Sequence, residues 1–193
     1  KDGVLWRYSY ADEKFERIFL GKETQITDIA IIHNRYIIAT TQNEGFFVYD
    51  TNSQQIKNFS THNTSAITSN NIFTVTVDSY GVAWFEGEQS GIIRYIPETA
   101  SLKHFQPKVD AVHKESVQRN LVIFEDTNNK LWINPQGGGF SYYDREADEL
   151  KPFFNEPGSE DCRFSNVIHT AFADKDNNLW ISTYNKGIEK IIN

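Results

Sequence analysis

The chain has 193 residues, enough to bury a hydrophobic core, and 14% of them are aromatic, which favours β-sheet. Its formal net charge of −7 disfavours nucleic acids and anionic membranes as partners, because both select basic surfaces. The single cysteine excludes an intramolecular disulfide and a thiolate metal cluster, and no apolar run approaches the roughly 20 residues of a membrane helix.

From the N-terminus onward the sequence predicts short strands separated by polar turns, with no helical period over ten residues. Residues 1–20, which carry Gly3, are predicted to be the third and fourth strands of a repeated four-stranded unit. Residues 35–59 belong to a second such unit, in which Gly45 stands at the position that Gly3 has in the first. The chain begins with Lys and has no Met, so we expect it to be a piece of a longer protein.

Three further units align without gaps, beginning at Asp78, Asp126 and Asp174, which are 48 residues apart. The same spacing relates two further sets of residues: Trp84, Trp132 and Trp180, and Gly91, Gly139 and Gly187. A regular repeat of this length is typical of β-propeller blades, each a small antiparallel sheet of four strands. The alternative, a β-sandwich, would not need an equal repeat length.

We therefore predict an all-β fold, a partial or small β-propeller of about four four-stranded antiparallel blades. The innermost strands are expected near residues 26–32, 71–77, 119–125 and 166–173. The predicted organisation is a partial blade at 1–20 and blades at about 21–60, 61–108, 109–156 and 157–193.

The recurrent residues are interpreted as scaffold, because recurrence in every blade marks packing rather than a single site. The three Trp side chains are expected to be largely buried between blades. The three Asp side chains are expected to cap turns by accepting backbone N–H bonds. At the turn position that holds Gly81, the later units have Asn129 and Asn177, which also tolerate positive φ.

These units resemble the two-component regulator propeller repeat, whose pattern is an N-x-[VI] strand, a D-x-x-G-x-[LA]-W turn and strand, and a G-x-x-[RK]-[YF] strand. The matches are Asn71-Ile72, Asp78 through Trp84, and Gly91 through Tyr95, with a second set running from Asn166 to Lys190. The resemblance implies a periplasmic sensor segment of a hybrid two-component system. In such proteins a membrane helix links the sensor to a cytoplasmic histidine kinase, and many members are similar in sensing oligosaccharides.

The sequence offers little for catalysis or for a cofactor, and none is expected. A calcium loop beginning at Asp174 fails, because Leu179 stands where glycine is needed. The five His residues lack metal-ligand spacing, and His169, on an inner strand, is interpreted as a core residue. Glu86 and Glu88 could share one face of a strand, as a glycosidase pair would, but nothing else supports that role.

Ligand binding is expected in non-recurrent residues of the blade loops, because propellers bind with loops at one end. The predicted ligand-binding residues are Tyr80, Phe85, Glu86, Arg119, Tyr184 and Lys186. The expected partners are an oligosaccharide and a second copy of the chain, joined through the terminal blades; membrane attachment is expected through the parent chain alone. Two other functions stay open: a propeller-fold polysaccharide lyase or glycosidase, and a non-catalytic scaffold for protein interactions.

Overall fold

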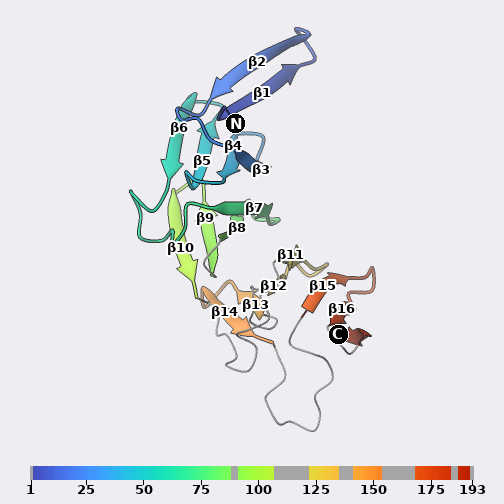
Figure 1. Ribbon diagram of the computed structural model, residues 1–193. Helices are drawn as coiled ribbons and strands as arrows, with labels where there is room; N and C mark the ends of the chain where they lie inside the picture. The colour runs from blue at the N-terminus through green and yellow to red at the C-terminus, as the bar shows by residue number, and fades with distance from the viewer. Residues whose placement is uncertain are drawn as a thin grey trace. The chain divides into compact units, whose positions relative to one another are not determined.

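The computed structural model describes residues 2–87, 91–106, 122–134, 141–153, 168–183 and 187–191. Within these ranges every regular element is a β-strand, and neighbouring strands of each sheet follow chain order (Figure 1). None of the described residues forms a helix that could span a membrane. The all-β prediction is confirmed.

Five sheets follow one another along the chain. The first is a hairpin of β1 (Val4–Ser9) and β2 (Lys14–Phe19). The second contains β3 (Ile26–Ile32), β4 (Tyr36–Thr41), β5 (Phe46–Asp50) and β6 (Gln55–Phe59). The third contains β7 (Ile72–Val77), β8 (Ala83–Gly87), β9 (Ile92–Ile96) and β10 (Ser101–Phe105). The fourth contains β11 (Val122–Glu125), β12 (Leu131–Asn134), β13 (Ser141–Asp144) and β14 (Glu149–Pro152). The last contains β15 (Ile168–Ala173), β16 (Leu179–Thr183) and β17 (Gly187–Ile191).

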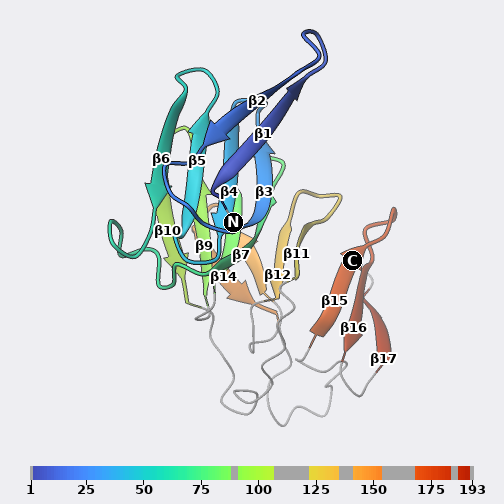
Figure 2. The same ribbon diagram turned by 45° about the horizontal axis from the view of Figure 1, so that its top comes forward.

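The chain forms two compact units. The first comprises Lys1–Val77, Gly81–Gln89 and Ile93–Lys103, and the second comprises Asp78–Tyr80, Ser90–Ile92 and His104–Asn193. Figure 2 shows β3, β4, β5 and β6 side by side in their order within the sheet.

The core of the first unit lies between the sheet β3–β6 and the sheet β7–β10. Phe46 of β5 stacks on Phe85 of β8 with ring centroids 4.4 Å apart, and it stacks on Phe59 of β6 at 5.0 Å. Strand β4 is apolar and β-branched, and its side chains are covered on both faces, as expected for a strand between neighbouring sheets. Burying each such Phe or Ile side chain contributes about 1.5–3 kcal/mol, so this core stabilises the unit.

The inner strands of adjacent sheets are also joined by hydrogen bonds. The Asp28 carboxylate in β3 accepts from the Thr74 hydroxyl at 2.9 Å and from the Val75 amide at 3.0 Å. The Thr27 hydroxyl donates to the Ile72 carbonyl at 2.6 Å. These bonds fix the register of β3 against β7.

A register shift recurs near the start of the inner strands. It falls between Ile26 and Asp28 in β3, between Ile72 and Thr74 in β7, and between Ile168 and Thr170 in β15. Each shift places one extra residue on the inner strand, as a β-bulge does, and redirects its side chain. In β15 that residue is the half-buried His169.

The core of the second unit lies between the sheet β11–β14 and the sheet β15–β17. Trp132 of β12 is 5% exposed and packs among Ile168, Ala171, Leu179 and Ile181. Packing between neighbouring blades is thus confirmed for Trp132, and Trp84 of the first unit is fully buried. Trp180 differs from the prediction because it is half-buried, on the sheet face opposite that of the buried Leu179 and Ile181.

Candidate functional site

The recurrent Asp side chains cap the turns between the first and second strands of their sheets. In the turn after β15, one Asp174 carboxylate oxygen accepts from the Asp176 amide at 3.0 Å and the Asn178 amide at 2.9 Å. The other accepts from the Trp180 indole N–H at 2.8 Å. Because the indole and the turn amides favour the charged form, the pKa of Asp174 lies well below its usual range.

The preceding sheet repeats this arrangement. The Asp126 carboxylate accepts from the backbone amides of Asn128 and Lys130 and, at 2.9 Å, from the Trp132 indole. The turn-capping prediction is confirmed, and the bond to Trp was not foreseen. The prediction that Asn replaces glycine at a turn position of positive φ is also confirmed. Asn129 and Asn177 have φ of 60°, close to the 74° of Gly81. These residues therefore belong to the scaffold.

Of the six predicted ligand-binding residues, the structure describes three. Tyr80 is 57% exposed in the β7–β8 turn, and Glu86 is buried in β8. Phe85 is 0% exposed because its strand is covered on both faces, so it is a core residue rather than a loop residue. Arg119, Tyr184 and Lys186, like Glu88 of the carboxylate pair, lie outside the described residues.

Tyr80 nevertheless has an ordered environment. The Arg145 guanidinium carbon lies 4.1 Å from its ring centroid, within cation–π range. The same guanidinium donates to Asp78 and to Glu125 at 3.0 Å each, with the Asp78 side chain buried. Arg145, which is held by two carboxylates, therefore packs against the exposed ring of Tyr80 and fixes its position.

The first unit contains a polar pocket of about 310 Å³. It opens at the end of the sheets where β3 turns into β4, β5 into β6, and β9 into β10. Its floor is mostly apolar and buried, and consists of Tyr36, Val48, Tyr95 and Pro97. Its rim is polar and includes Arg35, Asp50, Ser53, Gln55, Lys57, Glu98 and Thr99.

An ion pair fixes one wall of this pocket. The Arg35 guanidinium donates from Nε to one Asp50 oxygen at 3.0 Å and from Nη2 to the other at 2.8 Å. This two-point contact holds the pKa of Asp50 well below its usual range and raises that of Arg35. The guanidinium carbon also lies 4.7 Å from the ring centroid of Tyr36. These contacts therefore fix the orientation of the Arg35 guanidinium.

The floor supplies a neutral phenol. Burial raises the pKa of Tyr95 to about 12, with smaller contributions from Tyr36 and Glu98. Tyr95 thus keeps its proton at physiological pH and can donate a hydrogen bond. Its ring also contacts Phe46, at a centroid distance of 5.3 Å, which anchors the floor to the core.

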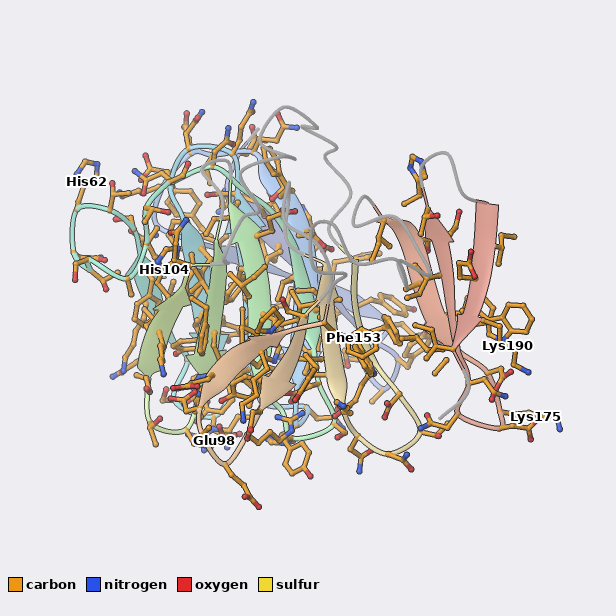
Figure 3. The ribbon with its side chains drawn as sticks, turned by 90° about the horizontal axis from the view of Figure 1, so that it is seen from below. His62, Glu98, His104, Phe153, Lys175 and Lys190 are labelled. Atoms are coloured by element: carbon orange, nitrogen blue, oxygen red, sulfur yellow. The ribbon has the colours of Figure 1, made fainter. Side chains whose placement is uncertain are left out.

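The open side of the pocket is formed by the β9–β10 turn. The Glu98 carboxylate in this turn lies 3.0 Å from Nδ1 of His33 in the β3–β4 turn, and Figure 3 labels Glu98 at this rim. Lys57 of β6 is exposed and has no carboxylate partner among the described residues. The pocket therefore combines an apolar floor, a fixed ion pair and a flexible ammonium, which suits binding of a polar molecule.

The sequence prediction missed this pocket because the Arg35–Asp50 pair has no counterpart in the repeat: Asp144 stands at the position of Asp50, but no Arg stands at the position of Arg35 in the other units. Arg35 stands where the other units have Gly81, Asn129 and Asn177, which is the kind of non-recurrence used to choose the other candidates. Their pairing across fifteen residues follows from the β4–β5 register, in which Tyr36 is opposite Asp50. The described residues contain no cluster of three or more His, Cys, Asp or Glu that could hold a metal ion.

The comparisons with known proteins agree with this architecture. Residues 163–185 match the family described as the two component regulator propeller. In this segment the chain is thus similar to a two component regulator propeller repeat. The matched segment includes Asp174 and Trp180, the pair that caps and braces the β15–β16 turn. No curated protein matches the chain.

Solved structures with a similar fold extend the likeness to nearly the whole chain. An extracellular domain of a hybrid two component system of B. thetaiotaomicron is 19% identical with a TM-score of 0.58, over 98% of this chain and 26% of that one. Virginiamycin B lyase of Staphylococcus aureus is 14% identical with a TM-score of 0.60, over 99% and 63% respectively. PorZ, a surface component of the type-IX secretion system of Porphyromonas gingivalis, is 15% identical with a TM-score of 0.56, over 97% and 29%. At such identities the likeness establishes the propeller fold, and this chain spans less than two thirds of each of these three proteins.

Proposed function

We propose that the chain is a ligand-sensing propeller segment of a hybrid two-component system. The observation that carries the proposal is the match of residues 163–185 to the two component regulator propeller, placed on the capped β15–β16 turn. The similar extracellular domain from B. thetaiotaomicron supports the same assignment. By this proposal the segment is not itself an enzyme. It lies in the periplasm as part of a parent chain that is anchored in the inner membrane and signals to a cytoplasmic histidine kinase.

The proposed ligand is an oligosaccharide. A ligand that binds one arrangement of the blades more tightly than another shifts the population between them, by no more than its difference in affinity. Domains that follow the propeller in the parent chain would relay this shift across the membrane. The chain's part is thus to convert binding into a change in the balance of conformations.

The test is calorimetric titration of the purified chain with oligosaccharides released from plant and microbial polysaccharides. Saturable binding, followed by recovery of the sugar unchanged by mass spectrometry, supports a sensor without catalysis. An absence of binding to every oligosaccharide would contradict the proposed ligand class.

A second function is kept because of one observation, the TM-score of 0.60 to virginiamycin B lyase. A lyase or glycosidase would shorten the sugar during the same titration, with new unsaturated or reducing ends. Appearance of such products would replace the sensor proposal with an enzymatic one. A scaffold for protein interactions would leave every sugar both unbound and intact.

A further inference from the structure

The polar pocket of the first unit continues into a second hollow. This second cavity, of about 580 Å³, is lined by residues of β6, the following loop and β10, and it shares Lys57 and Ala100 with the pocket. The two together form a groove along the outer strands β6 and β10, with Lys57 where they meet. An elongated molecule could therefore enter both, whereas the pocket alone, at 310 Å³, is at the small end of ligand sites.

The charges of the groove select against a strongly charged ligand. Arg35 is neutralised by Asp50, with both carboxylate oxygens occupied. The remaining formal charges are Lys57 and Glu98, of opposite sign. An anionic ligand would meet Glu98 and a cationic ligand would meet Lys57, so the formal charges of the groove sum to zero and a neutral ligand meets no net charge.

The neutral polar groups suit hydroxyls. The amide of Gln55 and the hydroxyl of Thr99 each donate and accept, as a sugar hydroxyl does. In the second hollow, Asn63 is already bonded on both sides of its amide, to the Ser60 amide and the Asn58 carbonyl. Asn63 therefore shapes the wall, and its neighbour Phe59 offers an apolar surface of the kind that packs against a sugar ring.

We propose that this groove binds a neutral, hydroxyl-rich oligomer. The groove runs from the pocket, beside the β5–β6 and β9–β10 turns, along β6 and β10. One sugar ring occupies the pocket against the floor of Tyr36 and Tyr95, and the chain continues past Lys57. This inference rests on the proposed function and locates its ligand at the strand-turn end of two adjacent blades. That end holds the turns between first and second and between third and fourth strands. Of the sequence-predicted residues that the structure describes, Tyr80 lies in a turn of the first kind, and Phe85 and Glu86 lie within β8.

The test titrates the whole chain with neutral gluco- and manno-oligosaccharides, from disaccharide to hexasaccharide. Matched uronate oligosaccharides and a tryptic peptide mixture serve as competing probes. Thr99→Trp fills the pocket from an exposed turn and should weaken binding more than tenfold. Lys57→Ala removes one polar contact at the join and should weaken it about three- to tenfold, with a larger effect on long oligomers than on disaccharides.

Lys175→Ala, at an exposed Lys in the β15–β16 turn of the second unit, is the matched control and should bind as the unaltered chain does. Thermal unfolding of each variant checks that the fold is kept. Binding that survives both groove substitutions would overturn the groove while leaving the sensor proposal intact. Tighter binding of uronates or peptides would overturn the neutral ligand, and binding of no oligosaccharide at all would overturn this inference together with the proposed ligand class.

Discussion

The indole nitrogen of Trp180 donates a hydrogen bond of 2.8 Å to the carboxylate of Asp174, six residues earlier in the chain. The preceding sheet contains the same bond at 2.9 Å between Trp132 and Asp126. One carboxylate therefore serves two purposes, because it closes a tight turn and also fixes the ring that the following strand presents. The sequence repeat preserves both partners at constant spacing.

Substitution of Trp132 and Trp180 by Ala should lower the free energy of unfolding by different amounts, because the two rings differ in burial. Trp132→Ala is expected to cost about 3–5 kcal/mol of unfolding free energy, the usual range for a buried Trp. Trp180→Ala should cost roughly half as much, because its ring is only half-buried and stacks on the exposed Phe172. Midpoints of guanidinium unfolding measure both, and equal losses would show that the two rings have equivalent surroundings.

The capping carboxylate predicts a pH dependence of stability. Because the pKa of Asp174 is lowered in the folded state, the unfolded chain takes up this proton first as the pH falls below about 4. The stabilisation is thus present at neutral pH and is lost on acidification toward the folded pKa. Asp174→Asn should be less stable at pH 7 and should lose less stability between about pH 6 and pH 3. A variant whose stability falls with acid as steeply as that of the unaltered chain would refute this linkage.

Substitution of two glycines by alanine distinguishes the cost of a strained backbone from the cost of a steric clash. A Cβ at Gly45 would lie 2.0 Å from the Phe59 carbonyl oxygen, whereas one at Gly21 would meet nothing within 4 Å. Both residues have positive φ, so Gly21→Ala should cost about 1 kcal/mol from the backbone alone. Gly45→Ala should cost roughly 2–4 kcal/mol, because the close contact adds to that strain. Urea unfolding of the two variants, if it gave equal losses, would contradict the close approach of β5 and β6.

Self-association through the terminal sheets stays a prediction. The β1–β2 hairpin exposes Trp6 by 62% and Phe15 by 68%, and the last sheet exposes Ile188 by 71%. Exposed apolar side chains of this size favour contact with another copy. Light scattering at tens of micromolar should therefore give a mass above that of the monomer, and Trp6→Lys combined with Phe15→Lys should lower it. A monomer at that concentration would exclude this mode of association.

The sequence was informative about the fold because blade structure is repeated. The recurrent Asp, Trp and turn Asn residues each predicted a local geometry that the described units contain. Trp180 was mispredicted because the repeat implies a covered face for every Trp, whereas coverage depends on the neighbouring sheet. Phe85 was mispredicted because its position after Trp84 suggested a loop, while β8 extends through Gly87 and is buried on both faces.

The pocket was not predicted, for a different reason. Arg35 has no counterpart in the other units, so no comparison between units could reveal its pairing with Asp50. Their partnership depends on the β4–β5 register, and the pocket further depends on how the β9–β10 turn lies beside the β5–β6 turn. Contacts between blades of this kind come from three-dimensional packing, which residue spacing within one blade does not specify.

The Asp126–Trp132 bond has a consequence for how such chains arise. Trp132 is oriented by a residue of its own blade and then packs on Ile181 of the next. The ring that packs on the next blade is therefore oriented within its own blade. Duplication of a 48-residue stretch of coding sequence would supply a new sheet that can stack immediately on the old one. Subsequent mutation is then free to diversify unique turns, such as the one that carries Arg35, while the duplicated bond keeps each added blade foldable.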